Sequence, residues 1–130
     1  MGIIEANGLK PLLHLLQSPD LDLISAAVSC VRNVTIRSEH ASPIIEAGFL
    51  QPLVNLMAFK DSEMIQRDAA DALGNLAESN EKNKIAVANA AVQSIKELIV
   101  ESPPGVQVAM ARCIRALSRS GMHSPFDCLL

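Results

Sequence analysis

With 130 residues, a formal charge of −3 and an aromatic content of only 2%, the chain fits one domain of ordinary size. Its apolar side chains are almost all aliphatic, and it contains neither Trp nor Tyr. This composition argues against nucleic-acid binding, which depends on a strongly basic surface and on aromatic rings that stack on bases.

The three cysteines are Cys30, Cys113 and Cys128, an odd number without a CxxC pair. Such spacing favours a reducing compartment over a disulfide framework. No apolar run approaches the ~20 residues that cross a bilayer, and no leader resembles a signal peptide. We therefore expect a cytoplasmic protein without direct membrane insertion.

The first third of the chain predicts two helices. One covers roughly residues 9–17, where leucines recur at helical spacing. The next has a stripe of apolar residues three and four positions apart, made by Leu23, Ala27, Cys30, Val31 and Val34. Ser18-Pro19 precedes it, which offers a capping hydroxyl and a proline suited to a first helical turn.

The rest of the chain repeats this pattern. Short helices are predicted at about 40–47 and 80–89, and further helices at about 50–59 and 91–101. Each set is followed by a longer helix, capped by Asp61-Ser62 in one case and started by Ser102-Pro103 in the other. The stripes of the two longer helices are Ile65, Ala69, Ala72, Leu73 and Leu76, and Val106, Met110, Cys113, Ile114 and Leu117.

Internal self-similarity links these sets. Residues 3–6 recur as residues 44–47, and residues 31–35 match 73–77 and, more weakly, 114–118. Three helices in about 41 residues are typical of stacked helical repeats. We predict an all-α fold, a right-handed α-solenoid of three repeats at about 1–38, 39–79 and 80–120, followed by a tail at 121–130.

The second unit carries the words Ile44-Ile45-Glu46-Ala47-Gly48, Pro52-Leu53-Val54-Asn55-Leu56 and Ala72-Leu73-Gly74-Asn75-Leu76-Ala77. These resemble the armadillo consensus, over about residues 3–118. Residues 2–11, 17–27 and 42–50 resemble more closely the armadillo adaptors of the fungal vacuole. That resemblance implies an adaptor on the cytosolic face of the vacuolar membrane, acting in vacuole inheritance, nucleus–vacuole contact and autophagy-related targeting.

Members of that subgroup are held on the membrane by acyl groups at the N-terminus. Here Met1-Gly2 is followed by Ala6 where the myristoylation motif requires Ser or Thr. We expect this chain to begin inside a repeat and to lack the lipid anchor.

The armadillo resemblance also implies a groove lined by the last helix of each repeat, in which an Asn hydrogen-bonds the backbone of an extended peptide. Asn33 and Asn75 match that position, and Ala116 replaces the third Asn. The alternative is that both Asn are ordinary polar residues near a helix end. Where import receptors of the superfamily carry Trp, this chain has other side chains, so recognition of basic import signals is disfavoured. Those positions are Ser29, Asp71 and Arg112.

All six arginines lie in or just after the last helix of a repeat, and all five lysines lie elsewhere. Four of the arginines are expected near the groove face, opposite Asp68 and Asp71, namely Arg32, Arg67, Arg112 and Arg115. One hypothesis is a locally basic strip that favours acidic peptides, and the alternative is an ordinary solvated helix surface. The predicted partner-binding residues are Ser29, Arg32, Asn33, Arg67, Asp71, Asn75, Arg112 and Arg115.

No residue pattern supports catalysis, a cofactor or a metal. Three histidines lack Cys or carboxylate neighbours at ligand spacing. Cys30 and Cys113 occupy the packing position of Ala72, which argues against a nucleophile. We expect a non-enzymatic adaptor that binds proteins. The alternative is a structural or regulatory piece that docks onto further repeats or a catalytic subunit, or self-associates through uncapped apolar ends, namely Ile3, Ile4, Phe126, Leu129 and Leu130.

Overall fold

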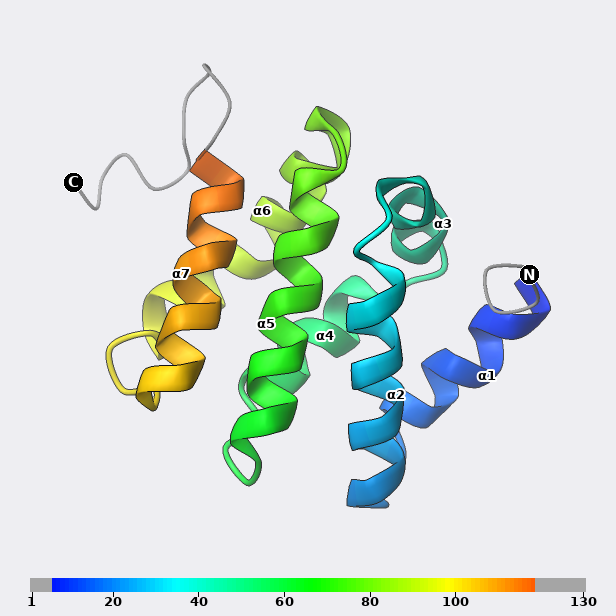
Figure 1. Cartoon of the computed structure of the whole chain (residues 1–130), viewed down its shortest axis with the longest axis horizontal. Coiled ribbons are helices and arrows are strands. Elements are labelled where there is room, and N and C mark those ends of the chain that lie inside the picture. The colour runs from blue at the N-terminus through cyan, green and yellow to red at the C-terminus, as the bar shows by residue number, and fades with distance from the viewer. Residues whose placement is uncertain (1–5, 119–130) are drawn as a thin grey trace.

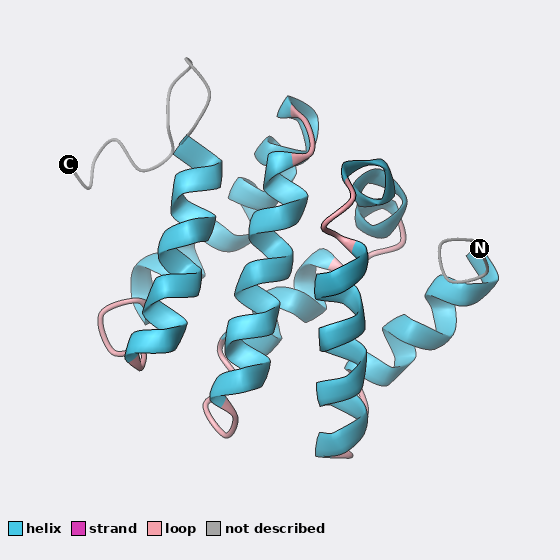
Figure 2. Cartoon of the chain, viewed as in Figure 1, coloured by secondary structure: helices cyan, strands magenta, loops and turns pink. Residues whose placement is uncertain are grey.

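A computed structural model describes residues 6–118 of the chain. In this part the protein is all-helical, with seven α-helices, one 3₁₀ turn and no strand (Figure 2). The elements are α1 (Ala6–Leu16), α2 (Leu21–Val34), η1 (Ser38–His40), α3 (Ala41–Glu46), α4 (Leu50–Met57), α5 (Glu63–Glu78), α6 (Glu81–Leu98) and α7 (Pro104–Ser118). The expected all-α stack is confirmed.

The three helices that the sequence marks as the last of each unit lie side by side. Figure 1 shows α2, α5 and α7 running in the same direction in one layer, with α4 and α6 behind them. The central helix, α5, contacts α2, α4, α6 and α7. The two helices beside it, α2 and α7, therefore present one continuous face together with α5.

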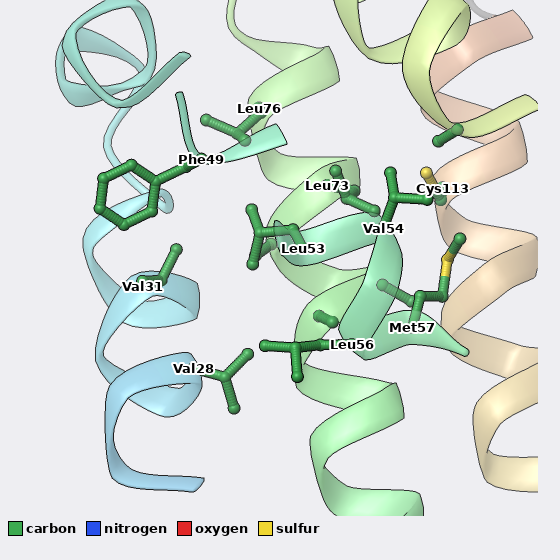
Figure 3. Packing of buried hydrophobic residues seen from close by; sticks show 14 of the residues in the cluster. Val28, Val31, Phe49, Leu53, Val54, Leu56, Met57, Leu73, Leu76 and Cys113 are labelled. Carbon is green, nitrogen blue, oxygen red and sulfur yellow. The ribbon is translucent and has the colours of Figure 1, made fainter. Parts of the chain in front are cut away.

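The core lies between that layer and α4. Phe49, Leu53 and Met57 are completely buried, and Figure 3 shows the side chains of α4 pointing between the three parallel helices. Val28 and Val31 approach this cluster from α2, whereas Cys113 and its neighbours approach it from α7. Burial of a large aliphatic side chain stabilises a fold by roughly 1.5–3 kcal/mol, so α4 fixes the spacing of the layer in front of it.

Two of the predicted helix starts were wrong, and one was right. The N-cap of α2 is Asp20, whose carboxylate accepts hydrogen bonds from the backbone N–H groups of residues 22 and 23; Ser18 Oγ instead accepts the N–H of Asp20. Ser102 lies two residues before α7, which begins at Pro104, and its hydroxyl donates to the carbonyl of Leu98 in the preceding helix. Ser62 caps α5 as predicted, accepting the N–H of Ile65 at 3.2 Å.

The third unit departs from the predicted helix plan. The two helices predicted at 80–89 and 91–101 are one helix, α6, which continues through Ala90 between the two predicted segments. In the second unit Gly48 lies between the corresponding segments, and its φ of +92° turns the chain between α3 and α4. A left-handed residue is a frequent helix end, and glycine adopts that conformation without a Cβ penalty.

Smaller boundary differences remain. The helix predicted at 9–17 begins at Ala6, the one at 50–59 ends at Met57, and the one at 40–47 is a 3₁₀ turn followed by α3. The predicted tail at 121–130 and the apolar ends of the chain lie outside the described residues, as do Cys128 and His123.

Candidate peptide-binding groove

The shared face of α2, α5 and α7 is hollowed by two adjoining depressions. The first has a volume of about 310 Å³ and is lined by residues from all three helices and the turn after α2, namely Arg32, Ile36, Ala70, Asp71, Gly74, Asn75, Glu78, Arg112 and Arg115. The second, nearer the helix N-termini, holds about 560 Å³ and is lined by Ser29, Arg32, Met64, Arg67, Asp68, Asp71, Gly105, Val108, Ala109 and Arg112. We call the two together the groove.

Seven of the eight predicted partner-binding residues line the groove, and Asn33 alone does not. Asn33 is exposed on α2. The reason is its place in the layer: Asn75, its counterpart on α5, contacts α2, whereas α2 is the last helix of the layer on its other side within the described residues.

The sequence analysis missed the apolar part of the groove. Ile36, Met64 and Val108 line it and are 67%, 52% and 53% exposed, respectively. Met64 and Val108 lie off the core stripes of α5 and α7, and Ile36 lies in the turn after α2. A partner side chain that covered them would remove apolar surface from water. Their position off the stripe was the available signal.

The charged side chains on the α2 side are already paired. Arg32 Nε donates to Asp71 Oδ2 at 3.3 Å and lies 3.7 Å from Asp68 Oδ1. The two carboxylates are only 14% and 12% exposed, and the arginine is 41% exposed. Burial raises the pKa of Asp68, the charge of Asp71 raises it further, and the guanidinium of Arg32 opposes the shift.

On the α7 side the arginines are not paired in this way. No ion pair joins Arg67, Arg112 or Arg115 to a carboxylate between residues 6 and 118. Arg67 lies beside the first turn of α7, where a Cβ on Gly105 would stand 3.5 Å from its Nη1. Four arginines and three acidic residues line the groove in all, so it carries one net positive charge in a chain whose formal charge is −3.

Asn75 is anchored to the neighbouring helix. Its Nδ2 donates to the carbonyl of Arg32 at 3.3 Å and to Thr35 Oγ1 at 3.2 Å. The Thr35 hydroxyl itself donates to the Arg32 carbonyl at 2.8 Å, so its oxygen can only accept from Asn75. Both amide protons are thereby used, and Oδ1 is the atom that Asn75 can offer to a ligand.

Gly74 lies where α5 packs against the backbone of α7. A Cβ at this residue would lie 3.4 Å from the Cα of Cys113. Cys113 is completely buried, and burial raises the pKa of its thiol to about 12. Cys30 is partly buried, and desolvation raises its pKa as well. These thiols pack between helices.

The described residues contain no group of three or more His, Cys, Asp or Glu side chains placed to hold a metal ion. Of the helices between residues 6 and 118, none has the length and apolarity to span a membrane.

Known proteins with similar sequences belong to a helical repeat family. The armadillo/β-catenin-like repeat family matches residues 3–36 and 37–78. The chain is 45% identical over 119 residues to vacuolar protein 8 of Schizosaccharomyces pombe, and 44% identical over 119 residues to that of Saccharomyces cerevisiae. Each alignment covers 91% of this chain, which spans only about a fifth of the relatives (22% and 21%).

Solved structures show the same arrangement. A designed armadillo repeat protein in complex with the peptide (KR)4 superposes with a TM-score of 0.80 at 31% identity, covering 88% of this chain and 48% of that one. A second designed armadillo repeat protein gives a TM-score of 0.80 at 29% identity, with 88% and 49% covered. On the family match and the shared fold, the chain belongs to the armadillo repeat family and is homologous to a portion of fungal vacuolar protein 8.

Proposed function

We propose that this chain is a non-catalytic binding module that holds an extended segment of a partner protein in the groove. The observation that carries the proposal is the convergence of seven predicted residues, from three separate helices, on two adjoining depressions. We also propose that the repeats are divided at about residues 1–38, 39–79 and 80–120.

The groove has the chemistry that an extended segment requires. Such a segment exposes a backbone N–H and C=O at every residue. The Oδ1 of Asn75 can accept one of those N–H groups, and the guanidinium groups can donate to carbonyls or carboxylates. The exposed side chains of Ile36 and Val108 add apolar surface at the two depressions. A designed armadillo repeat protein of the same fold is in complex with the peptide (KR)4, which supports peptide binding by this fold.

The relatives support a proposal for the place of action. Because the chain is homologous to a portion of vacuolar protein 8, we propose an adaptor associated with the cytosolic face of the vacuole. Its partners there would take part in vacuole tethering and inheritance or in autophagy-related targeting.

The proposal is tested with an array of peptides cut from candidate partner proteins. The groove variant Ile36→Ser/Val108→Ser removes two exposed apolar side chains at the depressions. The matched control Ile85→Ser/Val100→Ser removes two that are also exposed, at 54% and 80%, but line neither depression. We expect binding to weaken at least about tenfold in the groove variant only, since burying two such side chains contributes a few kcal/mol.

Light scattering on the same samples distinguishes the adaptor from the alternative, a structural piece that docks onto further repeats or self-associates. A monomer that binds peptides through the groove supports the adaptor. Concentration-dependent self-association without peptide binding, or equal losses in the two variants, would remove the support for it.

A further inference from the structure

The charges of the groove differ between its two sides. On the α2 side, Arg32 already donates to Asp71 at 3.3 Å, and Asp68 lies 3.7 Å away. Both carboxylates are largely covered, at 14% and 12% exposed. A partner carboxylate that approached Arg32 would therefore meet two negative charges beside the guanidinium.

On the α7 side, Arg112 and Arg115 are exposed and line the first depression. They stand three residues apart on one helix, so their side chains share a face. Neither forms an ion pair within the described part of the chain. Two adjacent guanidinium groups can donate several hydrogen bonds to one carboxylate, in a geometry that a neutral amide cannot match.

We propose that Arg112 and Arg115 recognise an acidic side chain of the bound segment, and that Asp71 is an internal competitor that withholds Arg32 from the same role. This inference rests on the proposed peptide-binding function and adds the chemistry and place of recognition. The acidic side chain lies between α5 and α7, where Gly74 contributes no side chain to the floor of the depression.

The alternative is that all four groove arginines contribute equally to binding an acidic segment. In that case Arg32 would contribute as much as the two α7 arginines. The pairing of Arg32 argues against this, because the carboxylates of Asp71 and Asp68 beside its guanidinium already offset its charge and would repel a partner carboxylate.

The first experiment compares two fluorescein-labelled octapeptides, one alternating glutamate with serine and one alternating glutamine with serine. We expect the full chain to bind the glutamate peptide at least about fivefold more tightly, as a charged acceptor strengthens hydrogen bonds to guanidinium. Arg112→Gln/Arg115→Gln abolishes that preference. The control Lys10→Gln/Lys82→Gln removes the same charge from exposed residues outside the groove and changes the preference less than about twofold, because exposed distant charges are screened.

The second experiment tests the competitor. Arg32→Gln changes affinity for the glutamate peptide less than about twofold in the wild-type background, whereas Asp71→Asn raises the affinity. In the Asp71→Asn background, Arg32→Gln then lowers it several-fold, because Arg32 has become available. Such non-additive effects would show that Asp71 limits the contribution of Arg32 to binding.

Three results would overturn the inference: no binding of the glutamate peptide, no preference over the glutamine peptide, or an Arg32→Gln loss in the wild-type background as large as that of Arg112→Gln/Arg115→Gln. Binding of neutral peptides that remains sensitive to Ile36→Ser/Val108→Ser would, in any of these cases, leave the proposed function standing. Loss of that sensitivity would remove the proposed function as well.

Discussion

Asn75 and Asn33 occupy equivalent positions on α5 and α2, and we predict that replacement by alanine lowers stability at Asn75 but not at Asn33. Asn75 donates two hydrogen bonds to the C-terminal end of α2, at 3.3 and 3.2 Å. Two net bonds contribute about 1–3 kcal/mol, and the better helix propensity of alanine returns about 0.5 kcal/mol. Asn75→Ala should therefore lower the free energy of unfolding by about 1–2 kcal/mol.

Asn33→Ala is the matched control, since Asn33 is exposed and gains only the helix propensity of alanine. We expect it to leave stability unchanged or raise it by up to ~0.5 kcal/mol. Urea unfolding followed by circular dichroism measures both, and an unchanged m-value would indicate that compactness is preserved. A loss of similar size in the two variants, or none in either, would refute the anchoring of Asn75 to α2.

The double variant Thr35→Val/Asn75→Ala tests the same contact through its other end. Because the Thr35 hydroxyl accepts from Asn75, the two single losses should sum to more than the loss in the double variant. Additive losses would mean that the two side chains act separately.

Three further predictions concern the groove floor, the thiols and the acidic pair. Gly74→Ala should raise the free energy of unfolding by about 0.5–1 kcal/mol, because alanine favours the helix and its Cβ would meet Cys113 at ordinary contact distances of 3.4–3.8 Å; a loss in thermal unfolding would show that α5 and α7 cannot accept the methyl group. Cys113, with a pKa raised to about 12, should resist alkylation at pH 8 in the folded chain and react once urea is added, as mapped by peptide mass spectrometry, whereas Cys30 should react first of the two; early modification of Cys113 would contradict its burial. Asp68 has a raised pKa, so its ionised form costs stability above that pKa and the cost fades as the pH falls through it; Asp68→Asn should therefore stabilise the chain at neutral pH and lose the advantage in acid, and a pH-independent difference would argue against desolvation as the cause.

The sequence was sufficient to predict the layer that forms the groove. The repeated apolar stripes align α2, α5 and α7 with one another, so the sequence alone assigns residues such as Arg32 and Arg115 to one face. Repetition works here because each unit buries the same positions against the next. The two helices of the second unit did not carry over to the third, where the chain turns at Gly48 in the one case and continues as a helix through Ala90 in the other.

The sequence could not predict which groove side chains satisfy one another. Repeat alignment makes Asn33 and Asn75 equivalent, but a hydrogen bond needs a partner within about 3.5 Å. Of the two, Asn75 has such partners, at the end of α2. Helix starts failed for a related reason: Ser18 and Asp20 can both cap, and which of them does depends on the backbone of the loop.

The same reasoning limits what a row of arginines can mean. Arg32, Gly74 and Arg115 hold equivalent positions on three adjacent helices, so the central helix leaves a gap between two guanidinium groups. Asp71, one turn before that gap, binds Arg32, and within residues 6–118 no carboxylate pairs with Arg115. Two arginines that the repeat makes equivalent thus differ in the free energy that they can offer to a ligand. The selectivity of such a groove depends on which of its charges are still unsatisfied in the folded chain, and counting charges along the repeat does not reveal that.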